Sequence, residues 1–271
     1  MPSYAIIGAS RGIGLEYVRQ LVTRPGDVVF AVVRSAATST HLQAVASAFA
    51  NVHILEGEVT DYASLQASRA ATISDINHGE LDCLIHSAAK TDLASFSKGY
   101  DSFATMDELD DDFIRAFKVN ALGFIHAVQA FLPLLRASRS PAGKRIVALG
   151  SVAVDPKFIR TTRSPDCVAY GMTKSAELIA ATKWAMHLDS ERFVVVSLSP
   201  GLVDSSQTLE QDDRAAIREW FRQTGESYVS MGLGDLRAQT VEESVSAQLR
   251  VIDGLRQEDN GKFFAHTGEE L

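Results

Sequence analysis

The stretch Gly8-Ala9-Ser10-Arg11-Gly12-Ile13-Gly14 decides the fold class of this chain. It follows an apolar strand predicted at Tyr4–Ile7 and opens a helix predicted at Ile13–Val22. Glycines let the backbone turn sharply and approach a pyrophosphate without a Cβ clash. The free N–H groups and the positive helix end then favour phosphate. The spacing is Gly-x-x-x-Gly-x-Gly rather than Gly-x-Gly-x-x-Gly, but its place between strand and helix predicts a dinucleotide-binding loop.

Apolar strand-like runs alternate with amphipathic helix-like runs along the whole chain. Strands are predicted at Tyr4–Ile7, Val28–Val33, Val52–Leu55, Leu81–His86, Arg145–Leu149, Phe193–Leu198 and Lys262–Ala265. Helices are predicted at Ile13–Val22, His41–Phe49, Tyr62–Ile76, about Met106–Arg136, Cys167–His187 and Val241–Ile252. This order predicts a Rossmann-type, doubly wound α/β fold, with helices on both faces of a parallel sheet. Ligands in such folds bind beyond the carboxyl ends of the strands.

The whole chain of 271 residues is predicted to form a single catalytic domain, because doubly wound folds often reach this length as one unit. A long stretch between Gly201 and Leu236 interrupts the alternation and carries Ile217, Trp220 and Phe221 at helical spacing. We interpret residues of about 202–236 as a substrate lid with its own short helix. The alternative is a surface elaboration that packs on the sheet edge.

Composition and net charge exclude some classes of binding partner. The formal net charge of −8 repels phosphate backbones, so we expect no nucleic-acid partner. The two cysteines, Cys83 and Cys167, fit a reducing compartment better than a disulfide framework. The chain begins without the pattern of a signal peptide and has no long run of purely apolar residues, so we expect a cytoplasmic protein without a membrane partner. No metal site is predicted.

Two arginines indicate which dinucleotide binds. The strand Val28–Val33 ends at Arg34, where NAD-binding sites carry an acidic side chain for the ribose hydroxyls. An arginine there can pair with a 2′-phosphate and stack on adenine. Arg11, inside the glycine loop, can reach the same phosphate. The pair therefore predicts NADP(H), although each could also be an ordinary surface arginine.

Tyr170, Lys174 and Ser151 predict proton-transfer chemistry. Tyr170 and Lys174 lie four residues apart on the predicted Cys167–His187 helix and so share a face. A tyrosine, with a pKa of about 10, is a poor acid or base near neutrality. We expect the Lys174 ammonium to favour the phenolate and to lower the pKa of Tyr170. Ser151 follows the strand Arg145–Leu149, where its hydroxyl can bond a substrate oxygen on which charge develops.

With these motifs in place, the chain resembles the short-chain dehydrogenase/reductase family over nearly its whole length. The resemblance rests on the glycine loop, on Tyr170-Gly171-Met172-Thr173-Lys174 as Tyr-x-x-x-Lys, on Ser151, on Asn120 in Lys118-Val119-Asn120-Ala121 and on Pro200-Gly201. The ending Gly261-Lys262-Phe263-Phe264, with His266 and Gly268, is similar to the norsolorinic acid ketoreductase group and related fungal reductases.

The resemblance implies an NADPH-dependent carbonyl reductase. Its catalytic set would be Asn120, Ser151, Tyr170 and Lys174. Tyr170 would be the general acid, Lys174 would also hold the nicotinamide ribose, and Asn120 would hold a water that links Lys174 to solvent. The cofactor-binding set would be Gly8, Ser10, Arg11, Gly12, Ile13, Gly14, Arg34, Glu58, Val59, Ala88, Ala89, Tyr170, Lys174, Pro200, Gly201, Val203 and Ser205. Ser205 stands where the family more often has Thr and would bond the nicotinamide carboxamide.

The resemblance also implies partners. A small-molecule ketone or alcohol would be the substrate, and the chain would form a homodimer or homotetramer through helices around Ala121–Arg136 and Val168–His187. The expected substrate is bulky or aromatic, of the polyketide type. Two alternatives stay open. One is a cofactor-bound protein with non-redox work such as cyclisation or scaffolding, and the other is physiological oxidation of an alcohol by the same residues.

The chain departs from the family pattern at three places. Where the family usually has Asn-Asn-Ala-Gly, it has His86-Ser87-Ala88-Ala89, and we interpret His86 as structural rather than catalytic. Glu58 replaces the usual Asp near adenine. The segment Ser151–Tyr170 is longer than in most members and borders the predicted substrate mouth. We therefore expect it to help set specificity, with Arg160, Arg163 and Asp166 as candidate contacts.

Overall fold

The structure of this chain is a computed structural model that describes residues 2–91, 96, 98–141, 143–208, 211–233 and 236–271. Its centre is one sheet of seven parallel strands in the order β3-β2-β1-β4-β5-β6-β9. The strands are β1 (Ser3–Ile7), β2 (Val28–Val33), β3 (Val52–Glu56), β4 (Cys83–His86), β5 (Lys144–Leu149), β6 (Phe193–Ser199) and β9 (Phe263–Ala265). The order reverses between β1 and β4, which confirms the doubly wound fold predicted from the sequence.

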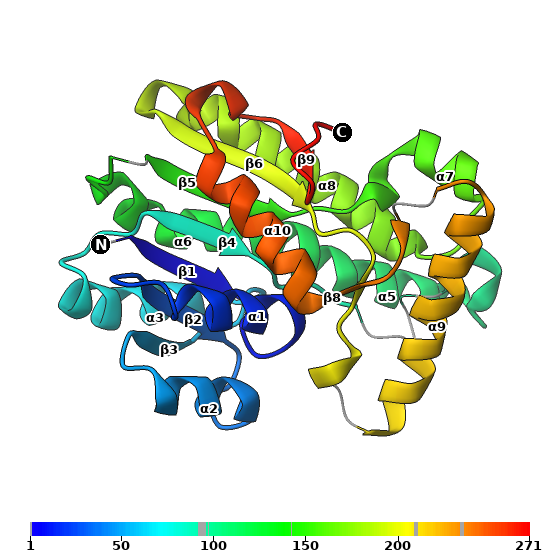
Figure 1. Cartoon of the computed structure of the whole chain (residues 1–271), viewed down its shortest axis with the longest axis horizontal. Helices are drawn as coiled ribbons and strands as arrows, with labels where there is room; N and C mark the ends of the chain where they lie inside the picture. Colours follow the sequence, from blue (N-terminus) through cyan, green and yellow to red (C-terminus); the bar gives the residue numbers. More distant parts are fainter. Residues whose placement is uncertain (1, 92–95, 97, 142, 209–210, 234–235) are drawn as a thin grey trace.

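Helices cover both faces of this sheet. They are α1 (Gly12–Leu21), α2 (Thr40–Ala48), α3 (Tyr62–Ile76), α5 (Met106–Phe117), α6 (Gly123–Ala137), α7 (Pro156–Thr162), α8 (Val168–Leu188), α9 (Gln211–Ser230) and α10 (Val241–Gly254). In Figure 1, α1 and α10 lie in front of the sheet, and α3, α6 and α8 lie behind it. The connections from β1 to β3 place α1 and α2 on one face, and those from β3 to β6 place α3, α6 and α8 on the other, as right-handed crossovers require. The helix α10, between β6 and β9, lies on the first face and departs from this rule.

Each face of the sheet has its own apolar core. Along β1, Ile6 packs into the cluster beneath α1 and α10, whereas Ala5 and Ile7 pack into the cluster beneath α6 and α8. Successive side chains of a strand point to opposite faces, so a strand covered on both sides must be apolar throughout. All five residues of β1 are buried, which explains the uninterrupted apolar runs in the sequence.

A long helical run follows β4 and reaches the end of α6. It passes from α5 through a π-helical turn, Lys118–Leu122, into α6. By length and composition alone, Met106–Ala137 is apolar enough to cross a membrane, yet 61% of its most apolar window is buried inside the protein. Packing of α6 against the sheet accounts for this apolar character.

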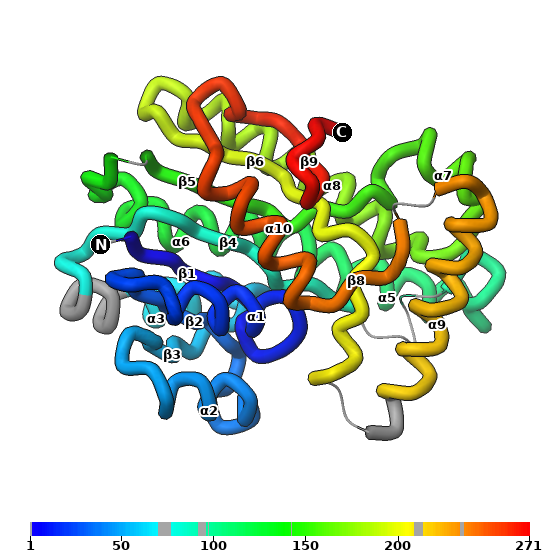
Figure 2. Tube along the Cα trace, in the orientation of Figure 1, coloured from blue at the N-terminus to red at the C-terminus, as the bar shows by residue number. Residues whose placement is uncertain are grey.

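The elements beyond the carboxyl ends of the strands differ most from prediction. The helix α9 has 20 residues, so the short helix expected within 202–236 was wrong in length. The helix α7, between Ser151 and Tyr170, was not predicted at all; Asp155 caps it and Pro156 begins it. A small sheet of β7 (Val203–Asp204) and β8 (Gln239–Thr240) joins the two ends of the α9 segment. Figure 2 traces this segment from β6 around α9 and back to α10.

Candidate active site

The glycine loop closes tightly between β1 and α1. Gly8 has φ +88°, and a Cβ there would lie 2.7 Å from the Ala88 Cα, while a Cβ at Gly14 would collide with the Gly8 carbonyl oxygen. Side chains at these two positions are therefore excluded by the backbone itself. The loop has the compact form that brings backbone N–H groups close to a phosphate, and the residues present fit a dinucleotide.

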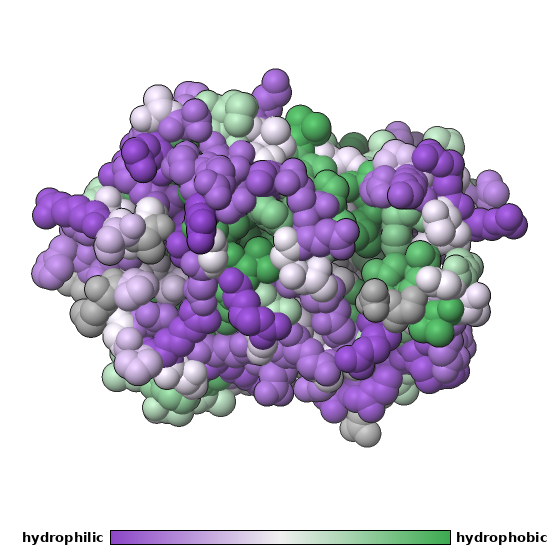
Figure 3. All heavy atoms as spheres, turned by 45° about the horizontal axis from the view of Figure 1, so that its top comes forward, coloured by the Kyte–Doolittle hydropathy of each residue, from purple (hydrophilic) through white to green (hydrophobic). Residues whose placement is uncertain are grey.

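A single cavity of about 1760 Å³ joins this loop to the carboxyl ends of β4, β5 and β6. Of the residues predicted to bind the cofactor or to catalyse, Gly14 and Asn120 do not line it, and all the others do. Gly14 lies beneath the loop against Gly8, and Asn120 is fully buried. Figure 3 shows a largely hydrophilic face of the molecule, with hydrophobic side chains visible in its hollows.

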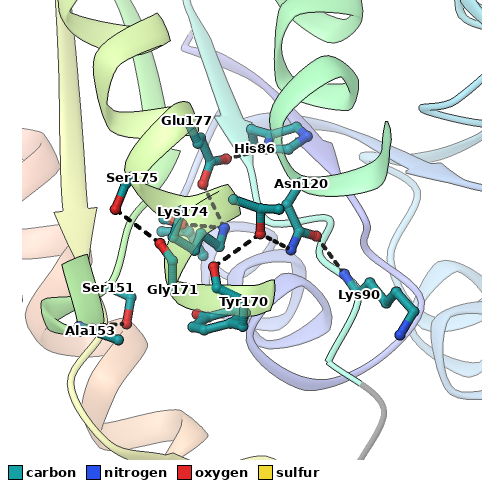
Figure 4. A network of polar contacts seen from close by, with 12 residues as sticks. His86, Lys90, Asn120, Ser151, Ala153, Tyr170, Gly171, Lys174, Ser175 and Glu177 are labelled. Carbon is teal, nitrogen blue, oxygen red and sulfur yellow. Dashed lines mark hydrogen bonds and ion pairs between the residues drawn. The ribbon is translucent and has the colours of Figure 1, made fainter. Parts of the chain in front are cut away.

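Tyr170, Lys174 and Ser151 meet in this cavity. Tyr170 and Lys174 lie in the first turns of α8, and the Lys174 Nζ is 5.9 Å from the centre of the Tyr170 ring. The Ser151 hydroxyl accepts from the Ala153 N–H at 3.2 Å and lies close enough to the Tyr170 phenol to lower its pKa. In Figure 4, Tyr170 and Lys174 lie on α8, and Ser151 lies to their left, beside Ala153. The end of a strand and one face of a helix bring them together, while their catalytic roles stay a prediction.

Lys174 lowers the pKa of Tyr170, as expected, but the net shift is in the opposite direction. Desolvation by the surrounding protein raises the pKa of the phenol, while Lys174 and the Ser151 hydroxyl lower it and the Glu177 carboxylate raises it again. The net pKa lies above the ordinary value, because burial and a neighbouring carboxylate outweigh one ammonium. Tyr170 therefore keeps its proton through the neutral range.

Lys174 is almost completely buried, at 2% exposure, and has an acidic partner. Its Nζ donates to the Leu149 carbonyl at 2.7 Å and to Glu177 Oε2 at 2.6 Å. Burial disfavours the ammonium, but the Glu177 carboxylate and Tyr170 outweigh this and raise the pKa of Lys174. Glu177 was missed in the sequence, although its position three residues after Lys174 on the same helix face was readable.

Asn120 braces the site from the π-helical turn. Its Oδ1 accepts from the Lys90 N–H at 2.7 Å, and its Nδ2 donates to Thr173 Oγ1 at 2.9 Å. The Thr173 hydroxyl in turn donates to the Tyr170 carbonyl at 2.9 Å. The Asn120 side chain thus steadies the helix turn that carries Tyr170. The water link between Asn120 and Lys174 stays a prediction.

The two arginines predicted to bind a 2′-phosphate both line the cavity and are exposed. Glu58, Val59, Ala88 and Ala89 line the same region. Thr208 was not predicted to contact the glycine loop. Its Oγ1 accepts from the Gly12 N–H at 3.0 Å, so this N–H of the loop already has a hydrogen-bond partner. The Ser205 Cβ lies 3.4 Å from the position that a Cβ on Gly12 would occupy.

Aromatic side chains form a wall on the substrate side of Tyr170. The Phe96 ring lies 4.8 Å from the Tyr170 ring and 5.6 Å from Trp220 on α9, all in edge-on arrangements. Farther out, Phe158 on α7 packs against Tyr228 on α9 at 5.6 Å. Of the candidate contacts in the Ser151–Tyr170 segment, Asp166 lines the cavity.

His86 is buried, and its Nδ1 lies 2.9 Å from Glu177 Oε1. It does not line the cavity. This placement agrees with the structural interpretation of His86 rather than with contact to substrate.

Comparison with known proteins decides the family. The family model for short chain dehydrogenases matches residues 4–216. This chain belongs to that family. A fungal member from Arthrinium sp., the short-chain dehydrogenase/reductase atnB, is 33% identical over 99% of this chain and 98% of its own length. The family places the chain among oxidoreductases that use a nicotinamide dinucleotide and small-molecule substrates, and the predicted fungal resemblance is confirmed.

Solved structures repeat the fold. A carbonyl reductase from chicken fatty liver, bound to NADPH, superimposes with a TM-score of 0.77 at 24% identity over 100% of this chain and 98% of that one. A 3-oxoacyl-[acyl-carrier protein] reductase from Brucella melitensis, in complex with NAD, gives 0.75 at 19% identity over 98% and 96%. Identities this low establish the shared architecture alone.

Proposed function

We propose that this chain is an NADPH-dependent carbonyl reductase that reduces a bulky or aromatic ketone, with Tyr170 as the proton donor. The observation that carries the proposal is the single cavity, which places Arg34 and the glycine loop at one end and Tyr170, Ser151 and the aromatic wall at the other. Its volume exceeds the 300–1,000 Å³ or so of an ordinary ligand pocket, so it has room for a dinucleotide and a large substrate together.

The chain's own residues account for the proton chemistry. A nicotinamide cofactor held along the glycine loop would supply the hydride. The Tyr170 phenol, whose pKa is raised, would donate its proton to the carbonyl oxygen, so that the ketone becomes an alcohol. Ser151 would orient the phenol and share charge on that oxygen. Lys174 would stabilise the phenolate left behind.

The choice of NADPH over NADH rests on Arg34 and Arg11, which line the cavity without an acidic residue at the end of β2. The NADPH in the chicken structure supports this choice, whereas the Brucella structure contains NAD.

The proposed lid is the α9 segment, because Ile217, Trp220 and Phe221 all line the cavity. A homo-oligomer is also proposed, supported by the exposure of Met172, Ile179 and Met186 along α8.

The test is consumption of NADPH, followed at 340 nm, with a panel of aryl ketones, quinones and small aliphatic ketones. We expect turnover with an aryl class, and a rate that stays level from about pH 6 to 9 and falls only above the ordinary tyrosine pKa of about 10. This direction follows because reduction needs protonated Tyr170, whose pKa is raised. Tight NADPH binding without turnover on any ketone would favour the non-redox alternative instead.

A further inference from the structure

A buried ion cluster lies directly behind the proposed active site. Lys174 is 2% exposed, and Glu177 and His86 are 0% exposed. One Glu177 oxygen accepts from the Lys174 Nζ at 2.6 Å, and the other lies 2.9 Å from His86 Nδ1. Figure 4 shows Glu177 between the other two side chains, with Lys174 on the same helix and His86 on β4. The function proposed above uses Lys174 but not the other two.

The Glu177 carboxylate offsets the free-energy cost of burying the Lys174 ammonium. An isolated ammonium removed from water loses so much solvation that it tends to give up its proton. A carboxylate with hydrogen bonds to both oxygens repays that cost. Two of the three N–H donors of Lys174 are used by Glu177 and the Leu149 carbonyl, so its charge and direction are both fixed from behind.

His86 contacts Glu177 and does not line the cavity. Its ring packs edge-on against Phe124 of α6 at 5.4 Å, and its Nε2 is buried without a hydrogen-bond partner. An imidazole with its proton on Nδ1 satisfies the Glu177 bond and leaves a lone pair, not an N–H, in the apolar surroundings. None of its atoms is exposed to solvent.

We propose that Glu177 is a positioning residue that keeps Lys174 protonated behind Tyr170, and that His86 holds Glu177 in place. The catalytic consequence rests on the proposed function, whereas the charge state of Lys174 does not. The groups that face Lys174 are Tyr170 and Glu177 on α8, with the Leu149 carbonyl on β5; Cys167 faces Tyr170, and His86 faces Glu177.

The first experiment measures unfolding by denaturant between pH 7 and 10 for the wild type, Glu177→Gln and Glu177→Asp. Without the carboxylate, the pKa of folded Lys174 drops below its unfolded value of about 10.4. The unfolded chain then binds a proton that the folded chain does not. The destabilisation caused by Glu177→Gln must therefore shrink as pH rises, by up to tenfold per pH unit in the unfolding equilibrium constant.

Glu177→Asp is the matched control, because it keeps the charge and shifts its position, so its effect on unfolding must not vary with pH. A Glu177→Gln effect that is equally independent of pH would overturn the proposal. If Glu177→Gln does not fold, the Lys174→Met and Glu177→Leu double variant decides. We expect it to be more stable than either single variant, because it removes both buried charges together; additive effects would overturn the proposal.

Neither unfolding measurement needs a substrate or a cofactor, so they stand even if no ketone is reduced. Where turnover is found, Glu177→Gln should lose kcat as pH rises from 6 to 9, by up to tenfold per unit, while the wild type stays level. A level Glu177→Gln profile with normal ketone reduction would sink this inference and leave the proposed function intact.

Discussion

The floor and the roof of the cleft are built in different ways. The floor consists of Ser151, Tyr170 and Lys174, which strand and helix ends hold through hydrogen bonds to Ala153, Leu149 and Glu177. The roof consists of α7 and α9, which meet through ring contacts such as Phe158 with Tyr228. Lys174 is 2% exposed, whereas Ile159 on α7 and Val229 on α9 are 39% and 51% exposed.

This difference separates reactivity from selectivity. A buried, charged hydrogen bond contributes roughly 1.5–3 kcal/mol, while an aromatic pair adds about 0.5–1.5 kcal/mol beyond its buried area. Changes in the floor should therefore alter turnover of every ketone alike. Changes in the roof should alter the ranking of ketones and leave the chemistry itself nearly unchanged.

The largest effect is expected for Tyr170→Phe. Removal of the general acid should lower kcat by roughly 10²- to 10⁴-fold for all ketones, while the variant stays folded, as measured by circular dichroism. Tyr228→Phe is the matched control in the roof, since Tyr228 also lines the cavity, and it should leave kcat nearly unchanged. If Tyr170→Phe turns over at the wild-type rate, the floor does not perform the chemistry.

Ser151→Ala should come next, with kcat lowered by roughly 10²- to 10³-fold, as when one donor to a developing oxyanion is removed. Loss of its hydroxyl also raises the pKa of Tyr170 further, because that hydroxyl lowers it. Ser175→Ala removes a hydroxyl that lines the same cavity but bonds the Gly171 carbonyl at 3.0 Å. Equal losses from the two variants would contradict the role given to Ser151.

Arg34→Ala tests the cofactor end of the cavity, outside the floor and the roof. Loss of a charged hydrogen bond should weaken NADPH binding by roughly 10- to 150-fold, corresponding to about 1.5–3 kcal/mol. NADH, which lacks the 2′-phosphate, is the internal control, and its binding should weaken far less, because only the contact with adenine is lost. The measurement is fluorescence titration with both cofactors, and an unaltered preference for NADPH would exclude Arg34 from phosphate binding.

The sequence predicted the floor well for a physical reason. Alternating apolar runs predict parallel strands, and the carboxyl ends of parallel strands meet at one edge, so Ser151, Tyr170 and the glycine loop had to lie close together. The sequence did not predict contacts between residues that lie far apart in the chain. Glu177 was visible three residues after Lys174, but nothing in the sequence paired it with His86, which is 91 positions away. The effect of Lys174 on the pKa of Tyr170 was predicted, but the larger, opposite effect of burial was not, because burial depends on packing.

The roof was harder to predict because its helices lack a strong pattern. The helix α7 has only seven residues, and the capping Asp155 followed by Pro156 was its available signal. The helix α9 was recognised from Ile217, Trp220 and Phe221, but its length was not. Helices outside the sheet layers are fixed mainly by tertiary contacts, which a single sequence does not contain.

Trp220→Ala gives the smallest expected effect and the most direct test of the roof. Trp220 reaches Tyr170 through Phe96 and lines the cavity, so its loss should raise KM for a bulky aryl ketone by about 2- to 12-fold, the equivalent of one aromatic contact of 0.5–1.5 kcal/mol. KM for a small aliphatic ketone, which need not touch the wall, should stay nearly constant. The ratio of the two KM values is unaffected by the fraction of protein that is folded. Trp184→Ala, which removes the indole of α8 that packs at the core beside His187, should therefore leave that ratio unchanged even if it lowers stability. If Trp220→Ala instead lowers kcat equally with both ketones, the roof takes part in the reaction itself. The floor and the roof would then not differ in function.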